Sequence, residues 1–279
     1  MTLLQNIPYV PDGHERQVLD LYLPDAPVTE ARPLVVWIHG GGWRNGSKDN
    51  APVADFIKDG FIGASITYRL SKDALWPAQI QDCKAAIRWL RYHAGEYGID
   101  PDRIGVWGPS AGGHLVAMLG TTGDYDGFRD GPYPEVSDAV QAVVNFYGPT
   151  DILRMNEQAP EDSTIDHDSP GSPEGQLVGG PIQEAPYRSR AETVNPIRYI
   201  TGTEPPMLHV HGTRDTVVPH GQSIILHEAL AAAGVDSTLM SRAGAGHGDG
   251  IRDSALVQGA VLAFFREHLG VFENPCRES

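Results

Sequence analysis

The chain of 279 residues has little cysteine, no long apolar run and no excess of basic side chains. Its two cysteines, Cys83 in an apolar helical pattern and Cys276 in a polar tail, are not spaced like a disulfide framework. Lysine and arginine number 21 against 36 aspartates and glutamates, and the net charge of −15 excludes the basic surface that nucleic-acid binding requires. The histidines lack neighbouring cysteine or glutamate clusters, so we expect no metal ion.

The chain also lacks the segments that direct a protein into a membrane. No apolar run approaches the roughly 18 residues of a membrane-spanning helix, so no membrane partner is expected. The first six residues, Met-Thr-Leu-Leu-Gln-Asn, have neither the basic nor the apolar region of a signal peptide. We therefore expect a cytoplasmic protein, or a secreted one whose signal peptide is absent from this chain. The sequence carries no signal for any particular oligomer.

Apolar runs typical of strands alternate with helical periodicity along most of the chain. Strands are expected at residues 18–23, 34–39, 61–68, 104–108, 142–147, 207–212 and 237–241. Apolar positions spaced three and four apart predict one long helix over residues 80–97, and similar stripes cover residues 225–233 and 257–269. This alternation predicts an α/β fold, in which a mainly parallel central sheet has helices on both faces.

Residues 151–206 break the alternation, because they are rich in proline, glycine, serine and acidic side chains. The segment is too long for a plain connection. We therefore predict a single domain over residues 1–279, with a loop-rich, lid-like insertion at about 151–206. Only 33 residues precede the strand at 34–39, and they include another expected strand, so we expect no large N-terminal cap.

The sequence Gly-Pro-Ser-Ala-Gly at residues 108–112 lies between an apolar strand pattern and the helix-like run 114–119. A strand, a Gly-x-Ser-x-Gly turn and a helix form a nucleophile elbow, which would expose Ser110 at the strand's end. The strand and helix backbones nearly touch in such a turn and leave no room for a side chain, which explains glycine at 108 and 112. An ordinary glycine-rich connection gives the same pentapeptide by chance, so this interpretation needs support from other residues.

Three glycines, at residues 40–42, follow the strand at 34–39 and leave backbone N–H groups uncovered. Such donors stabilise the negative oxygen of an acyl-transfer transition state by roughly 3–4 kcal/mol each. We assign this role to the N–H groups of Gly41, Gly42 and Ala111. The N–H of Ala111 qualifies because it lies at the start of a helix. A phosphate-binding loop is excluded because the lysine of Gly-Ser-Lys at 46–48 comes last. His39 is interpreted as a structural residue that orients the loop.

A serine nucleophile requires a histidine base and a carboxylate that orients this base. In this fold both are expected later in the chain, the acid before the histidine. Asp215 lies in the loop after the strand at 207–212 and is the predicted acid. His247 lies among small residues at 243–248, which allow a close approach to a serine, and is the predicted base.

Three other residues compete for these two roles. His211 precedes the acid, which is the wrong chain order, and His220 is too close to Asp215 to reach the site from a separate loop. Asp249 lies only two residues from His247. The sequence therefore predicts Ser110, Asp215 and His247 as the catalytic set.

These residues carry a resemblance to the α/β-hydrolase superfamily, in particular to bacterial serine esterases with a His-Gly-Gly-Gly-Trp oxyanion motif. The chain is most similar to bifunctional feruloyl and acetyl-xylan esterases, which are related to hormone-sensitive-lipase-like carboxylesterases. Besides the elbow, Asp215 and His247, the resemblance covers residues 39–43, 68–70, 76–79, 82–91, 97–101 and 145–149. Pro109 departs from the pattern, since such elbows usually carry an acidic or a small residue there.

The predicted function is hydrolysis of short-chain or aromatic carboxylic esters, of acetyl or feruloyl type, through an acyl-serine intermediate and without a cofactor. The ester would be a small molecule or linked to a polymer. The aromatic residues near strand ends, expected to line the substrate pocket, are Trp43, Tyr68, Trp76 and Tyr147. An amidase resembling kynurenine formamidases remains an alternative, because a triad does not separate ester from amide chemistry. A non-catalytic ligand-binding homologue is a further alternative.

Overall fold

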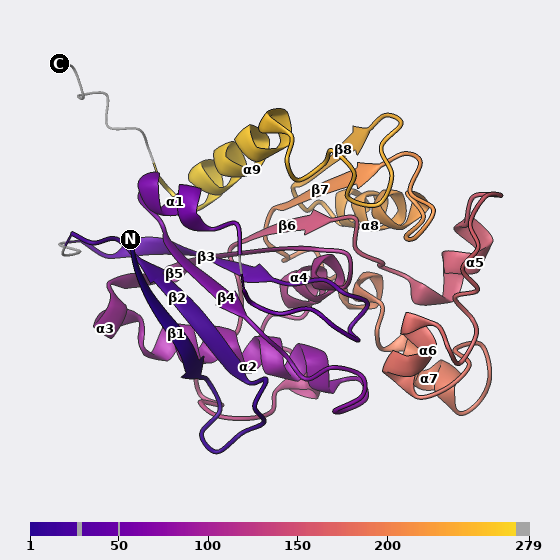
Figure 1. Ribbon diagram of the computed structural model, residues 1–279, viewed down its shortest axis with the longest axis horizontal. Helices are drawn as coiled ribbons and strands as arrows, with labels where there is room; N and C mark the ends of the chain where they lie inside the picture. The colour runs from indigo at the N-terminus through magenta and orange to yellow at the C-terminus, as the bar shows by residue number, and fades with distance from the viewer. Residues whose placement is uncertain (27–29, 50, 272–279) are drawn as a thin grey trace.

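The computed structural model describes residues 1–26, 30–49 and 51–271, and it contains one eight-stranded sheet (Figure 1). The strand order is β1-β2-β4-β3-β5-β6-β7-β8. The strands are β1 (Thr2–Pro8), β2 (Val18–Leu23), β3 (Arg32–Ile38), β4 (Ile62–Ile66), β5 (Ile99–Pro109), β6 (Ala142–Phe146), β7 (Met207–Gly212) and β8 (Ser237–Arg242). Strand β2 is antiparallel to β1 and β4, whereas all pairs from β4 to β8 are parallel.

Helices cover both faces of this sheet (Figure 1). One face packs on α1 (Ala54–Lys58) and α9 (Ala255–His268), and the other on α2 (Ala78–Tyr92), α3 (Ala94–Tyr97), α4 (Ala111–Thr121) and α8 (Gly221–Ala232). A short 3₁₀ helix, η1 (Asp126–Phe128), follows α4. Each face has its own apolar cluster, so the sheet is buried on both sides, as its continuous apolar strands predict.

Two expectations about the elements need correction. Strand β1 was not expected, because it is an edge strand whose side chains are mostly exposed and show no clean apolar alternation. The single helix expected over residues 80–97 is divided at His93, where the imidazole Nδ1 contacts the Trp89 carbonyl at 2.9 Å and stacks on its indole. Cys83 is buried and free, and Cys276 lies outside the described residues.

The segment between β6 and β7 contains η2 (Ile152–Arg154), α5 (Met155–Gln158), α6 (Pro173–Val178), α7 (Tyr187–Glu192) and η3 (Pro196–Tyr199). Helices α5, α6 and α7 gather at one end of the sheet (Figure 1). Hydrogen bonds join the segment to the body: Trp76 Nε1–H donates to Thr193 Oγ1 at 3.0 Å, and Ser163 Oγ–H donates to the Thr216 carbonyl at 2.8 Å. The insertion is therefore an ordered wall beside the sheet.

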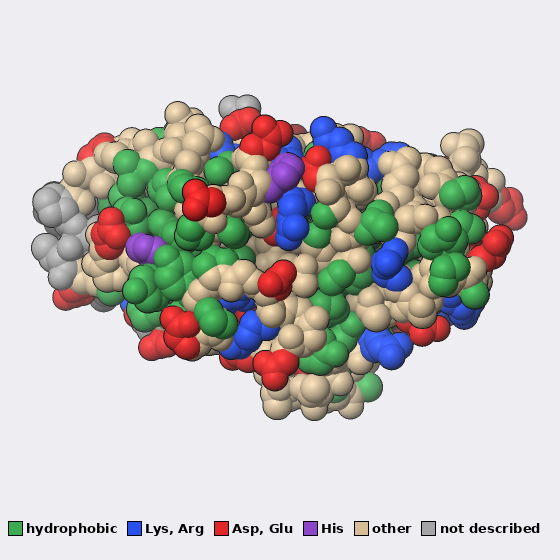
Figure 2. All heavy atoms as spheres, turned by 90° about the horizontal axis from the view of Figure 1, so that it is seen from below, with side chains coloured by type: hydrophobic (Ala, Val, Ile, Leu, Met, Phe, Trp, Pro, Cys, Tyr) green, Lys and Arg blue, Asp and Glu red, His purple; other side chains and the backbone are tan. Residues whose placement is uncertain are grey.

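The surface carries charges of both signs. On the face seen from below, basic side chains are scattered among acidic ones, and hydrophobic side chains gather toward one side (Figure 2). This arrangement differs from the continuous basic stripe typical of nucleic-acid-binding surfaces. Among the described residues, no helix is long and apolar enough to cross a membrane.

Three buried histidines make the fold sensitive to acid. Burial lowers the pKa of His39 and of His114 to about 4, and that of His209 to about 3. Below pH 6.5 the unfolded chain binds protons that the folded chain excludes, so the free energy of unfolding should fall as the pH falls. The expected decrease approaches about 1.4 kcal/mol per pH unit for each histidine between pH 6.5 and 4. Urea unfolding at pH 7, 6 and 5 measures it.

Two variants test whether the buried histidines cause this pH dependence of stability. His209→Gln should reduce the slope of the unfolding free energy against pH by up to about 1.4 kcal/mol per pH unit, the share of one histidine. His14→Gln, at an exposed position, should leave this slope unchanged. A urea midpoint that is constant from pH 7 to pH 5 would contradict the prediction.

Candidate active site

Ser110 lies in a tight turn between β5 and α4. Its backbone has φ 54° and ψ −122°, a strained conformation typical of a nucleophile elbow. The turn requires glycine on both sides, because a Cβ at Gly108 or Gly112 would lie 2.4 or 2.1 Å from the Ile38 carbonyl oxygen. The Ser110 amide donates to the Phe146 carbonyl at 2.8 Å, which fixes the turn against β6. The elbow predicted from the glycine spacing is thus present.

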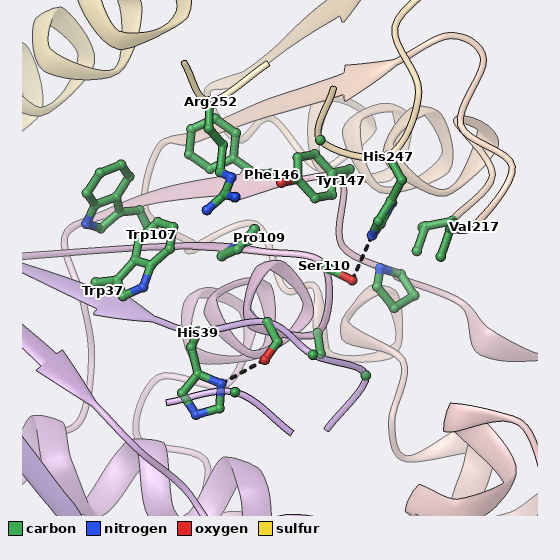
Figure 3. Close-up of a pocket in the computed structure, with 18 of the residues that line it drawn as sticks. Trp37, His39, Trp107, Pro109, Ser110, Phe146, Tyr147, Val217, His247 and Arg252 are labelled. Carbon is green, nitrogen blue, oxygen red and sulfur yellow. Dashed lines mark hydrogen bonds between the residues drawn. The ribbon is translucent and has the colours of Figure 1, made fainter. Parts of the chain in front are cut away.

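Ser110, His247 and Asp215 come together although they are far apart in the chain. Figure 3 shows the His247 ring pointing toward Ser110. His247 Nε2 lies 3.0 Å from Ser110 Oγ, and His247 Nδ1 lies 2.7 Å from Asp215 Oδ2. With hydrogen on Nδ1, the imidazole donates to the carboxylate and accepts from the serine hydroxyl. This is the tautomer in which a histidine can remove a serine proton.

The Asp215 carboxylate is buried and fully bonded. Its Oδ1 accepts from the amides of Val217 and Val218 at 2.8 and 2.9 Å, and its Oδ2 faces His211 Nε2 at 3.2 Å as well as His247. Burial alone would raise the pKa of Asp215, but the bonds from His211 and His247 outweigh burial and hold it well below the ordinary value. Asp215 is therefore ionised near neutral pH.

His211, which the sequence analysis rejected as a base, lies beside the acid. It is fully buried, its Nδ1 contacts Ser223 Oγ at 2.8 Å, and its Nε2 contacts the Val218 carbonyl at 2.9 Å. Because Nε2 faces only acceptors, it carries hydrogen and can donate to Asp215. His211 thus holds the acid in place, a contribution that chain order alone could not reveal.

The glycine loop passes close to Ser110. Gly41 has φ +108° and Gly42 has φ +59°, and both values favour glycine. Within the described residues, the amides of Gly41, Gly42 and Ala111 have no hydrogen-bond acceptor. These three N–H groups are available to a ligand beside Ser110.

His39 lies behind this loop. Its ring stacks on Tyr68 with centroids 4.4 Å apart, its Nδ1–H donates to the Gly40 carbonyl at 2.7 Å (Figure 3), and Arg16 Nη2 donates to its Nε2 at 3.3 Å. The Tyr68 hydroxyl donates to the His39 carbonyl at 3.0 Å. These contacts fix the backbone of the loop.

Ser110 opens into a cavity of about 1540 Å³. Trp43 and Tyr147 line it, and the Tyr147 ring lies edge-on to His247 with centroids 4.7 Å apart. The expectation for Tyr68 and Trp76 is wrong: neither lines the cavity. Tyr68 is buried against His39, and Trp76 packs on His114 and Phe128.

One wall of this cavity is aromatic and was not expected from the sequence; we call it the aromatic arm. It consists of Trp37, Phe56, Trp107 and Phe146. The Trp37 and Trp107 rings meet edge-on at 4.7 Å, and Phe56 lies 5.0 Å from Trp107. Figure 3 shows Trp37, Trp107 and Phe146 of this arm on one side of Ser110, with Arg252 above them and Val217 on the opposite side. The continuous apolar runs of these strands place Trp37 and Trp107 inside the fold but do not indicate a cavity.

The opposite wall comes from the insertion. Residues 165–174 contribute eight cavity-lining residues, and we call this segment the insertion wall: Ile165, Asp166, His167, Ser169, Gly171, Ser172, Pro173 and Glu174. It reaches the glycine loop, because a Cβ at Gly42 would lie 3.3 Å from the Cβ of Pro173. Among the described residues, no group of three or more metal-ligating side chains is present.

Comparison with known proteins identifies the family. The BD-FAE family profile matches residues 19–230, which is most of the chain. The chain belongs to the BD-FAE family. Esterase LipC of Mycobacterium tuberculosis is 34% identical over 245 residues, which cover 86% of this chain and 58% of LipC. The chain spans about half the length of the curated relatives it matches, 53% for LipQ and 58% for LipC.

Solved structures of similar length share the BD-FAE member's architecture. A truncated carbohydrate esterase from gut microbiota has 33% identity and a TM-score of 0.83, and the match covers 97% of each chain. An acetyl ester-xyloside bifunctional hydrolase from Caldicellulosiruptor lactoaceticus has 26% identity and a TM-score of 0.72, covering 91% of this chain and 89% of that one. With the mainly parallel sheet, these matches establish the α/β-hydrolase fold.

Proposed function

We propose that this BD-FAE family member is a serine carboxylesterase. The observation that carries the proposal is the continuous hydrogen-bonded line from Ser110 Oγ through His247 to Asp215, at 3.0 and 2.7 Å, opening into a large cavity. The named relatives support it, since they are esterases and carboxylic ester hydrolases. Serine chemistry of this kind needs no cofactor.

The reaction begins when His247 Nε2 takes the proton of Ser110 as Oγ attacks the ester carbonyl carbon. The carbonyl oxygen becomes an oxyanion, and the tetrahedral intermediate then expels the alcohol oxygen, which receives the proton from His247. An acyl-serine remains. Water loses a proton to His247 as it attacks this intermediate, and Ser110 regains the proton when the carboxylic acid leaves. Asp215 stabilises the imidazolium throughout.

The oxyanion is held by backbone groups. The amides of Gly41, Gly42 and Ala111 have no acceptor in the described structure and are our proposed donors. Ala111 is the first residue of α4, where the helix dipole also favours an anion. Donors that are fixed before the reaction stabilise the transition state without reorganisation.

The proposed acyl group is short or aromatic, of acetyl or feruloyl type. The aromatic arm offers apolar ring surface beside Ser110, where a planar acyl group can pack edge-on or offset. The names of the similar structures point toward esters of sugars, since one is a carbohydrate esterase and another an acetyl ester-xyloside hydrolase. The alcohol would accordingly be a small molecule or part of a polymer.

A substrate panel tests this function. Wild type and Ser110→Ala should be compared on p-nitrophenyl acetate, p-nitrophenyl octanoate, methyl ferulate and N-formylkynurenine. We expect Ser110-dependent cleavage of the acetate and the ferulate, because the proposed acyl group is short or aromatic. A preference for octanoate would contradict the short or aromatic acyl specificity. Cleavage of N-formylkynurenine alone would replace ester by formamide hydrolysis, and no Ser110-dependent turnover would overturn the enzyme assignment.

A further inference from the structure

The insertion wall contains a buried pair of titratable side chains that the proposed mechanism does not use. His167 is 2% exposed and Glu174 is 3% exposed, and both line the cavity that contains Ser110. His167 Nδ1 lies 3.2 Å from Glu174 Oε2, but the two atoms are not aligned for a hydrogen bond. Within the described residues, His167 Nε2 and Glu174 Oε2 have no hydrogen-bond partner either.

It is unusual for a buried carboxylate to have so few hydrogen-bond donors. Transfer of a carboxylate away from water is costly unless cations or N–H donors surround it. Among the described residues, Glu174 has no lysine or arginine partner, and only His167 lies within ion-pair distance. Buried polar groups normally have their hydrogen bonds satisfied, so this pair has spare bonding capacity on a cavity wall.

Several hydrogen bonds hold the segment that carries the pair. Ser172 Oγ–H donates to the His167 carbonyl at 2.9 Å and accepts from the Gly175 amide at 2.8 Å. The His167 amide donates to Asn156 Oδ1 at 2.8 Å. These bonds hold the two side chains in place before any ligand arrives, as a specific binding site requires.

The insertion wall lies on the side from which an alcohol must leave. His247 protonates the departing alcohol oxygen, so the alcohol part of the ester lies toward His247 and Val217 rather than toward the aromatic arm (Figure 3). The insertion is bonded to the loop that precedes Val217, through Ser163 Oγ and the Thr216 carbonyl at 2.8 Å. Pro173, next to Glu174, packs against Gly42.

We propose that Glu174, positioned by His167, accepts hydrogen bonds from hydroxyl groups of the ester's alcohol part and so selects polyhydroxylated alcohols such as sugar rings. Because Oε2 is buried and faces His167, Oε1 is the oxygen that remains for a ligand, and charge-assisted bonds to a carboxylate are stronger than neutral ones. This specificity rests on the proposed ester hydrolysis.

The charge of the cavity argues against an anionic alcohol. Its walls carry seven carboxylates and two guanidinium groups: Asp49, Asp55, Asp59, Asp166, Glu174, Asp249 and Asp253, with Arg44 and Arg252. A negative field of this kind repels anionic ligands. A neutral polyol can still bind, because its hydroxyl groups donate to carboxylates.

The test compares two acetate esters with six-membered alcohol rings, of which only the first carries free ring hydroxyl groups: methyl 3-O-acetyl-β-D-xylopyranoside and cyclohexyl acetate. Acid release in a pH-stat gives kcat/KM for each ester. The readout is the kcat/KM of the xyloside divided by that of cyclohexyl acetate. Glu174→Gln should lower this ratio by about 10–100-fold, since a lost bond to a charged group has that effect. His167→Gln should lower it less and mainly through KM, because His167 acts by positioning Glu174.

Glu161→Gln is the matched control, because Glu161 is exposed, belongs to the same insertion and does not line the cavity. Its ratio should equal that of wild type. Equal losses on both esters in Glu174→Gln, or an unchanged ratio with an unchanged melting temperature, would overturn the proposal and leave Glu174 a structural residue. If wild type cleaves neither ester in a Ser110-dependent way, the proposed function fails instead, and this specificity with it.

Discussion

Replacement of Ser110 by alanine should lower kcat for p-nitrophenyl acetate by about 10⁴–10⁶-fold, because no other hydroxyl is hydrogen-bonded to His247 Nε2 in the described structure. The amides of Gly41, Gly42 and Ala111 remain in place, so a residual rate above that of water is expected from transition-state binding alone. Steady-state kinetics with an active-site titration of the wild type measures the ratio.

The change should leave the fold intact. Ser110 already adopts φ 54°, and alanine has a Cβ as serine does, so the replacement adds no new backbone conflict. The melting temperature should therefore stay within about 2–4 °C of wild type, the shift that corresponds to about 1 kcal/mol in a protein of this size. A folded Ser110→Ala variant that keeps wild-type turnover would show that the nucleophile lies elsewhere.

Replacement of Asp215 by asparagine should lower kcat by about 10⁴-fold. The amides of Val217 and Val218 donate to Oδ1, so the asparagine oxygen will occupy that position and its NH₂ group will face His247 Nδ1. An NH₂ donor forces hydrogen onto Nε2 of His247, and this tautomer cannot accept the Ser110 proton. The pH–rate profile of kcat measures the effect and should show that activity partly returns at alkaline pH.

Asp249 provides the matched control, because it lines the cavity but has no bond to His247. Asp249→Asn should change kcat by less than about threefold, as expected for a substitution away from specific interactions. A larger loss in Asp249→Asn than in Asp215→Asn would reverse the assignment of the acid.

The features that the sequence predicts best are those whose geometry is local. The elbow needs glycine at 108 and 112 because both positions touch the Ile38 carbonyl oxygen, and a spacing of two residues on either side of Ser110 encodes this. The sheet follows from seven apolar runs, each of which forms a strand. The order of acid before histidine in the chain argued against His211 as the base. The two residues that this order favoured, Asp215 and His247, are in contact.

The errors concern contacts between distant segments. Tyr68 and Trp76 follow strand ends, as cavity residues do, but long-range partners bury them: His39 covers Tyr68, and Thr193 bonds to Trp76. Trp37 and Trp107 look like ordinary core residues, yet they line the cavity together. Such differences depend on which helices cover each strand end, and neither periodicity nor composition describes that packing.

The insertion touches two neighbouring loops at once: Pro173 packs on the glycine loop, and Ser163 bonds to the loop that carries Asp215. A substitution that moves the backbone of the insertion should therefore also move these two loops, unlike a side-chain change such as Glu174→Gln. We expect larger changes in the insertion, such as added or deleted residues, to alter substrate preference and turnover together. New specificities that keep full speed should arise more readily in the aromatic arm, which is carried by β3, α1, β5 and β6.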